Sequence, residues 1–164
     1  MAVRLRWRGV SILAAALILF SACSSGASSH PITGATATTG PIVVTTNLAS
    51  YTTGDAVGAI VTNSSKSNFY AQDGKSACTI VQLEKYDATS GEWKHVDLCN
   101  GSQATQVLML AENSSVPYTL APTSTSDVNA WDAGTYRVAV VYSTAADGAT
   151  GVQEAHSAAF TING

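Results

Sequence analysis

The chain has 164 residues, enough for one domain of ordinary size, and 46% of them are hydrophobic while only 12% are charged. Beyond residue 22, five Lys and Arg stand against eleven Asp and Glu, which gives this part of the chain a net charge of −6. An acidic surface without a basic stripe repels phosphate backbones, so nucleic acid is excluded as an expected partner.

The first 22 residues have the layout of a secretory signal. Arg4, Arg6 and Arg8 are followed by the apolar run VSILAAALILF over residues 10–20 and then by small residues. Eleven residues at ~1.5 Å rise each cannot cross a hydrocarbon core of ~30 Å, which disfavours a permanent transmembrane helix. The sequence therefore predicts a cleaved signal peptide over residues 1–22 and an exported protein.

The segment Phe20-Ser21-Ala22-Cys23 resembles the lipobox of bacterial lipoproteins, in which small residues precede an invariant Cys. Phe20 stands where Leu is commonest in that family. The resemblance implies that Cys23 carries a diacylglycerol and anchors the protein to a membrane of the cell envelope, with its domain on the extracytoplasmic side. The alternative is an ordinary signal peptide cut near Ala22, which leaves Cys23 as an unpaired thiol in an oxidising compartment.

Residues 23–40 are expected to connect this anchor to the folded part. After Cys23 they read SSGASSHPITGATATTG, which is small, polar and uncharged. Such a segment cannot bury apolar surface, so we expect a flexible tether with an r.m.s. span of ~20–25 Å. His30 is expected to be a linker residue, and residues 41–164 are expected to form one domain.

The folded part predicts an all-β domain. Short runs rich in Val, Ile, Thr and Tyr recur between clusters of Gly, Asn, Asp, Ser and Pro, which is typical of a sandwich or barrel. The segments 51–55 and 86–93 are expected to be turns. The predicted strands cover residues 42–47, 56–63, 68–72, 79–86, 92–98, 105–110, 116–121, 134–143 and 153–162.

The hairpin between residues 78 and 99 is the best-defined part of the pattern. A four-residue loop over 88–91, with Gly91 in the left-handed conformation, places Tyr86 opposite Trp93. Side-chain alternation then gives two faces. The core face is predicted to hold Val81, Leu83, Val96 and Leu98, and the other face Gln82, Glu84, Tyr86, Trp93, His95 and Asp97.

Cys78 and Cys99 fall on the polar face of this hairpin, one diagonal step apart. That separation is slightly too long for a Cβ–Cβ distance of ~3.8 Å unless twist or a bulge draws the strands together. In an exported protein a Cys78–Cys99 disulfide is the default, and it leaves Cys23 for the lipid. The alternatives are two free thiols or a metal-binding pair, for which no further ligand set is seen nearby.

The run Asp132-Ala133-Gly134-Thr135-Tyr136 resembles the D-x-G-x-Y signature that opens strand F of immunoglobulin-like domains. The resemblance implies an immunoglobulin-like antiparallel β-sandwich of about seven to nine strands. It also implies a tyrosine corner built from Asp132, Gly134 and Tyr136, in which the Tyr136 hydroxyl returns to the backbone upstream. Val138 stands where antibody domains have their second Cys, so we expect a bacterial type without the inter-sheet disulfide.

Alternation within the last two predicted strands separates inward from outward residues. We expect Arg137 and Ser143 to face outward. Those expected to face the core are Tyr136, Val138, Val140 and Tyr142 on the first strand and Ala158, Phe160 and Ile162 on the last.

No catalytic constellation stands out, and we expect a protein that is not an enzyme. His95 and His156 are the only His bases in the domain, and no G-x-S-x-G motif is present. Three His scattered along the chain argue against a zinc or copper site, so no metal or cofactor is expected. Three carboxylates lie in predicted loops: Asp127, Asp132 and Asp147. We expect them to cap turns, and the alternative is that they ligate Ca²⁺.

Two further features bear on function. Tyr86, Trp93 and His95 form an exposed patch that either anchors a partner or only stabilises the hairpin end by ~0.5–1 kcal/mol. Asn63-Ser64-Ser65, Asn100-Gly101-Ser102 and Asn113-Ser114-Ser115 match glycosylation sequons, but in a bacterial protein they are interpreted as polar turns.

Together these features predict a noncatalytic, membrane-anchored envelope lipoprotein. Its domain is expected to serve as a binding, adhesion or assembly module for an unknown protein or envelope ligand. The alternative is an extracytoplasmic peptidase inhibitor or regulator that inserts a loop, such as residues 144–152, into an enzyme cleft.

Overall fold

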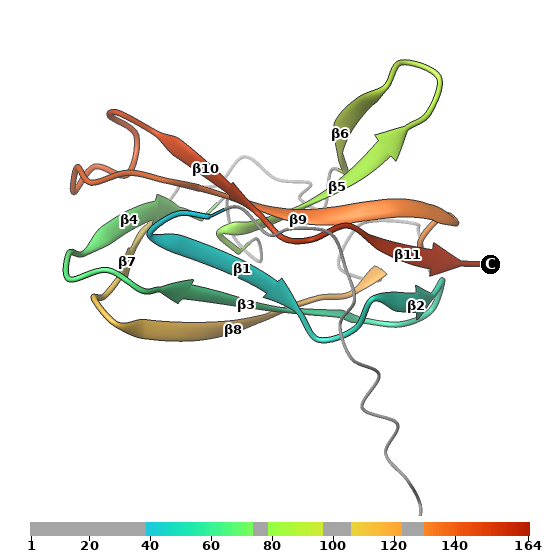
Figure 1. Ribbon diagram of the computed structural model, residues 1–164, viewed down its shortest axis with the longest axis horizontal. Coiled ribbons are helices and arrows are strands. Elements are labelled where there is room, and N and C mark those ends of the chain that lie inside the picture. The colour runs from blue at the N-terminus through green and yellow to red at the C-terminus, as the bar shows by residue number, and fades with distance from the viewer. Residues whose placement is uncertain (1–38, 74–78, 97–105, 123–129) are drawn as a thin grey trace, which may run out of the picture.

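The computed structural model describes residues 39–73, 79–96, 106–122 and 130–164 (Figure 1). Every regular element within these ranges is a β-strand, and no helix there is long and apolar enough to span a membrane. The strands are β1 (Ile42–Thr46), β2 (Ser50–Thr52), β3 (Val57–Asn63), β4 (Phe69–Gln72), β5 (Val81–Asp87), β6 (Glu92–Val96), β7 (Val107–Leu110), β8 (Ser114–Leu120), β9 (Gly134–Tyr142), β10 (Gln153–His156) and β11 (Phe160–Asn163).

Several predicted features lie outside the described residues and stay predictions. They are the signal peptide, Cys23 and its lipidation, His30, the Cys78–Cys99 disulfide, and Asp127.

The smaller sheet contains three strands in the order β1-β3-β8, all antiparallel. Strands β1 and β3 alternate between buried and more exposed residues, whereas β8 alternates between half-buried and exposed residues up to the buried Leu120. Val44 on β1 and Val57 on β3 are fully buried, whereas Ile60 is 42% exposed. One face of this sheet therefore lies against the core and the other faces solvent.

The larger sheet has the order β2-β11-β9-β5-β6, and β10 also pairs with β9. Its pairs are antiparallel except for β2 and β11, which run parallel. Strand β9 lies at the centre, and its Val138 and Val140 are fully buried, as predicted from alternation. Figure 1 shows the larger sheet stacked above the smaller one, so the all-β domain is sandwich-like.

Strands β10 and β11 form one edge of β9 that is interrupted by a bulge. Ala155 pairs with Val140, but Phe160 pairs with Tyr136, so the register shifts by one residue between them. Because of this shift Ser157, rather than Ala158, takes the inward position and is 5% exposed. The predicted inward orientation of Ala158 is wrong, and that of Phe160 is correct.

The ribbon of β4 and β7 joins the two sheets at one end of the domain. Tyr70 on β4 and Ser143 exchange two backbone hydrogen bonds of 2.8 Å. Ser143 is therefore fully buried, which corrects its predicted outward position. Its hydroxyl accepts a hydrogen bond from the Ala145 N–H at 2.9 Å and donates to the Thr150 carbonyl, so the buried polar group is satisfied.

Strand β2 corrects the prediction of a turn at residues 51–55. Tyr51 is 2% exposed, and its ring meets that of Phe160 edge-on at a centroid distance of 5.1 Å. Because this ring is buried against β11, residues Ser50–Thr52 adopt an extended strand conformation. The turn comes after the strand, where the Asp55 N–H donates to the Thr52 carbonyl. The nine predicted strands become eleven because β2 is added and the last strand is split.

One hydrophobic core fills the space between the sheets. Both sheets contribute to it, and its largest fully buried side chains include Ile42, Val61, Leu83 and Ile162. Removal of these side chains from water is the main force that holds the layers together.

Candidate functional site

The hairpin of β5 and β6 projects beyond the body of the domain (Figure 1). Its register pairs Tyr86 with Trp93 and Leu83 with Val96, as predicted. Gly91 has a φ of 72°, and its N–H donates to the Asp87 carbonyl at 2.8 Å. The predicted four-residue loop is confirmed, and the turn residue that the sequence offers fits the left-handed position.

Two aromatic side chains lie together on the outer face of this hairpin. The ring centroids of Tyr86 and Trp93 are 5.2 Å apart with an interplanar angle of 56°. Tyr86 is 39% exposed. The pair therefore presents apolar surface to solvent in a fixed arrangement, which a freely rotating side chain cannot do.

Arg137 on β9 extends this pair across the sheet. Its guanidinium lies over the Trp93 ring at 4.5 Å from the centroid, and its Nε donates to Glu84 Oε2 at 2.5 Å. The side chains of Arg137 and Glu84 are 21% and 13% exposed, so the pair is partly shielded from water. The ring and the carboxylate together hold the guanidinium in one orientation.

A third group, His156 on β10, continues the row. Its Nε2 lies 3.2 Å from Glu154 Oε1 and 3.8 Å from Glu84 Oε2. These three side chains offer one donor atom each within 4.8 Å of one another, an arrangement that could hold a metal ion. In the sequence the His residues are scattered, because β5 and β10 are distant in the chain and are brought together only through their pairing with β9.

Side chains from four adjacent strands thus form one row on the outer face of the larger sheet, which we call the outer-face row. The outer-face row consists of Trp93, Tyr86, Glu84, Arg137, His156 and Glu154. Of the predicted patch, the structure brings Tyr86 and Trp93 together. His95 is exposed and lies opposite Glu84 in the strand pairing.

Side-chain alternation predicts Glu84 on the same face as Tyr86 and Trp93, and it predicts an outward Arg137. Alternation does not predict that Arg137 lies beside Glu84, because the pairing of β5 with β9 joins residues 53 positions apart. The outward positions of Glu84 and Arg137 would have predicted the outer-face row if the order of the strands in the sheet had been known.

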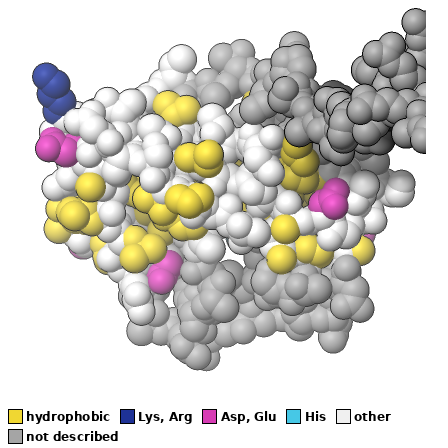
Figure 2. All heavy atoms as spheres, turned by 90° about the horizontal axis from the view of Figure 1, so that it is seen from below, with side chains coloured by type: hydrophobic (Ala, Val, Ile, Leu, Met, Phe, Trp, Pro, Cys, Tyr) yellow, Lys and Arg dark blue, Asp and Glu magenta, His cyan; other side chains and the backbone are white. Residues whose placement is uncertain are grey.

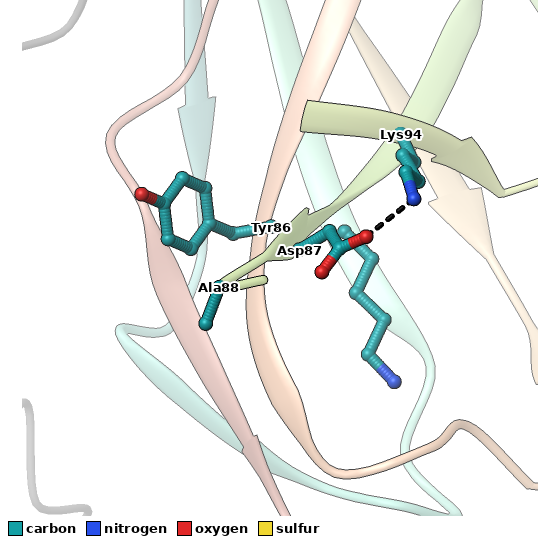
Figure 3. A pocket seen from close by; sticks show the side chains of 5 residues that line it. Tyr86, Asp87, Ala88 and Lys94 are labelled. Atoms are coloured by element: carbon teal, nitrogen blue, oxygen red, sulfur yellow. Dashed lines mark hydrogen bonds and ion pairs between the residues drawn. The ribbon is translucent and has the colours of Figure 1, made fainter. Parts of the chain in front are cut away.

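A hollow of about 330 Å³ lies beside the tip of the hairpin, and Figure 3 shows the side chains that line it. It is lined by Lys85, Tyr86, Asp87, Ala88 and Lys94. Lys94 pairs with Asp87, which holds the pKa of that carboxyl well below its usual range, and Lys85 Nζ lies 3.2 Å from Asp132 Oδ2. Both cations of the hollow are therefore already paired with carboxylates, which disfavours it as an anion site.

The predicted tyrosine-corner residues lie at the start of β9. The Tyr136 hydroxyl donates a hydrogen bond to the Asp132 carbonyl at 2.8 Å. The ring is 2% exposed, and burial raises the pKa of Tyr136. Gly134 approaches Lys85 closely, since a Cβ there would lie 2.9 Å from Lys85 Cε. These contacts fix the start of β9 and thereby the strand that carries Arg137.

The loop between β9 and β10 is organised by Asp147. Its carboxylate accepts hydrogen bonds from the N–H groups of Ala149 and Thr150, both at 2.9 Å, and from the Thr150 hydroxyl at 2.6 Å. These bonds lower the pKa of Asp147 to about 2, the Thr150 hydroxyl being the largest cause. This geometry agrees with the turn-capping interpretation, because both carboxylate oxygens accept hydrogen bonds from groups within the loop.

The outer face of the smaller sheet differs sharply in chemistry. Figure 2 views the domain from below and shows hydrophobic side chains left of centre and again at the right, with few charged side chains between them. Ile60 on β3 is 42% exposed on this face, and Val107, Leu108 and Met109 on β7 of the neighbouring β4–β7 ribbon are 37–56% exposed. The outward positions of the three strands hold Val43, Thr45, Ile60, Thr62, Ser115, Pro117 and Thr119, none of them charged.

Comparison with known proteins assigns no family to this arrangement. No protein-family model matches the chain, and no curated protein matches its sequence.

Proposed function

We propose that the protein is an exported, lipid-anchored envelope lipoprotein. Its domain, in this proposal, is a noncatalytic binding module that engages a protein or envelope ligand through the outer-face row. The observation that carries the binding role is that Tyr86, Trp93, Arg137 and Glu84 already hold one another on an exposed sheet face. Aromatic and Arg side chains are the commonest energetic anchors of interfaces, and pre-organised groups lose less entropy on binding.

An immunoglobulin-like fold forms part of the proposal. In such domains the first, second and fifth strands share one sheet, and the sixth lies between the third and the seventh in the other. The order β1-β3-β8 and the position of β9 between β5 and β10–β11 agree with this arrangement. The hydrogen bond from Tyr136 to the Asp132 carbonyl supports the same assignment.

The anchoring part is tested by cell fractionation of the wild type and Cys23→Ala. We expect the wild type to partition with membranes and the variant to be released. Mass spectrometry of the purified wild type should find residue 23 acylated. A variant that stays fully membrane-bound, or an unmodified Cys23, would refute the anchor and leave the binding role to be judged separately.

The binding face is tested by site-specific photo-crosslinking in the cells that make the protein. A benzophenone side chain placed at Tyr86 should give discrete adducts, and these should disappear when Arg137→Ala is added. The same probe at Thr119, on the opposite sheet, is the matched control and should give none of these adducts. Equal adducts from both positions, or none from Tyr86, would contradict the proposal.

One observation favours peptidase inhibition as a second function. The loop over 144–152 is held by Asp147 and by the Gln72 side chain, whose Nε2 donates to the Asp147 carbonyl at 3.1 Å. A loop fixed in this way has little entropy to lose in an enzyme cleft. A panel of peptidases assayed with the purified protein separates the two functions, because the binding module should inhibit none of them.

A further inference from the structure

We propose that Glu84, Glu154 and His156 form a zinc-binding site on the outer face of the larger sheet. Metal binding is an additional property beyond the proposed binding role. It depends neither on an external partner nor on the lipid anchor. It rests on strand register, on donor geometry, and on the side chains that support the ligands.

Register explains how ligands from distant parts of the chain converge. Glu84 lies opposite Arg137 across β5 and β9, and His156 lies opposite Ala139 across β9 and β10. Ala139 faces outward yet is fully buried, so longer neighbouring side chains cover it. The small methyl group leaves room above β9 for side chains from β5 and β10 to meet.

The distances fit one small ion. His156 Nε2 lies 3.2 Å from Glu154 Oε1 and 3.8 Å from Glu84 Oε2. Zinc bonds of ~2.0–2.1 Å in a tetrahedron place neighbouring donor atoms ~3.4 Å apart. Two of the three donor separations therefore stand close to those that a bound ion requires, and the third, between the two carboxylate oxygens, lies within 4.8 Å and closes by side-chain rotation.

The donor set selects the kind of metal. One imidazole nitrogen and two carboxylate oxygens suit Zn²⁺, whereas Mg²⁺ and Ca²⁺ prefer sites built from oxygen alone. Three protein ligands leave a fourth tetrahedral position for water. The donor nitrogen of His156 is shielded from solvent, while Glu154 is 46% exposed and leaves a route for the ion to enter.

Arg137 supports the site as a positioning residue. Ligating carboxylates are usually hydrogen-bonded by a second layer of side chains, and Arg137 Nε holds Glu84 at 2.5 Å. The two carboxylates and the one guanidinium together carry one net negative charge. A divalent cation compensates this charge and relieves the repulsion between the two carboxylates.

The test is calorimetric titration of the full chain with ZnCl₂ after metal is removed with EDTA. We expect one Zn²⁺ per chain, with affinity reduced by about tenfold or more in His156→Gln and in Glu154→Gln. His95→Gln, on the same face, and Glu92→Gln, on the same hairpin, are matched controls and should bind as the wild type does. Circular dichroism verifies that each variant is folded. Should His156→Gln be unstable, Glu154→Gln still tests the site, because the Glu154 side chain is exposed and its replacement leaves the fold intact.

The chain's thiols are a competing source of zinc affinity that the design separates. All four variants keep Cys23, Cys78 and Cys99, so binding through thiolates would survive in His156→Gln. Cobalt substitution adds a second readout, because the proposed site should give visible absorption without a thiolate charge-transfer band. Absence of zinc binding, equal binding in His156→Gln, or a thiolate band would overturn the proposal.

Discussion

At the scale of single residues, polar groups hold this β-domain in one register. The Tyr136 hydroxyl fixes the start of β9 through the Asp132 carbonyl, and its ring stacks on Phe160 at a centroid distance of 6.1 Å. Asp147 organises the loop at the other end of the strand by accepting three hydrogen bonds. Both residues act on β9, and β9 carries Arg137 to the outer-face row.

Tyr136→Phe isolates the hydroxyl at this corner, because the variant keeps the buried ring. We expect a loss of ~1–2 kcal/mol in the free energy of unfolding, since the Asp132 carbonyl loses its donor. Urea denaturation of both proteins measures the difference. Tyr70→Phe is the control on β4, and a Tyr136 variant as stable as the wild type would show that the hydrogen bond contributes nothing net.

The Asp147 carboxyl should titrate with a pKa of about 2. A carboxyl whose folded pKa is lowered contributes stability above its unfolded pKa of ~3.9, and this contribution disappears as the pH falls through the folded value. Carboxyl-detected NMR gives the midpoint directly. In parallel, the stability difference between wild type and Asp147→Asn should shrink between pH 4 and 2; a midpoint near 4 would contradict the capping geometry.

At the scale of elements, side-chain hydrogen bonds connect the ends of strands in addition to the backbone hydrogen bonds between paired strands. Asn63, at the end of β3, is 1% exposed. Its Nδ2 donates to the carbonyls of Ser67, Leu110 and Ala111 at 2.8–3.0 Å. The segment that the sequence presented as a polar turn therefore centres on a buried amide that links β3 to the turn between β7 and β8.

Asn63→Asp should be strongly destabilising, because it replaces the donating amide with a carboxylate facing three carbonyl oxygens. We expect a loss of ~3 kcal/mol or more at pH 7, measured by urea denaturation. Asn68→Asp is the matched control. Asn68 uses its Oδ1 to accept from the Glu112 N–H at 3.0 Å, and Asp retains that acceptor. Similar small losses in both variants would refute the role of the Asn63 amide.

Gly91→Ala tests the hairpin that carries the aromatic pair. The φ of 72° at this position costs an L-residue ~1–2 kcal/mol. We therefore expect the free energy of unfolding of Gly91→Ala, measured by urea denaturation, to be lower than that of the wild type by this amount. Near-ultraviolet circular dichroism should also show weaker exciton coupling between Tyr86 and Trp93. Ser90→Ala, one residue earlier, should have little effect, and an unchanged Gly91→Ala protein would contradict the turn geometry.

At the scale of the whole molecule, the two sheets share one core and are joined by the β4–β7 ribbon. Trp131 is 5% exposed, and its Nε1 donates to the Asp55 carbonyl at 2.8 Å, which ties the segment before β9 to the segment after β2. Among the described residues, the buried side chains of both sheets belong to one cluster, and neither sheet has a second core of its own there. Unfolding should therefore be a single cooperative event.

This cooperativity is measured by following urea unfolding with far-ultraviolet circular dichroism and with tryptophan fluorescence. The two transitions should coincide in midpoint and slope, since loss of either sheet exposes the shared core. Two separate midpoints would mean that one sheet unfolds while the other persists.

Apart from β2 and the division of the last strand into β10 and β11, the sequence by itself determined the strands, the hairpin register around Gly91 and the core-facing residues of β9. Alternation and turn chemistry act over a few neighbouring residues, which is why the sequence carries this information. It also indicated that Glu84 on β5 and Arg137 on β9 lie on the outer face. Only the tertiary structure decided that Glu84, Arg137 and His156 meet, that Ser143 is buried under β4, and that a bulge turns Ser157 inward. These outcomes depend on which distant strands pair and with what offset, and local preferences carry no information about that choice.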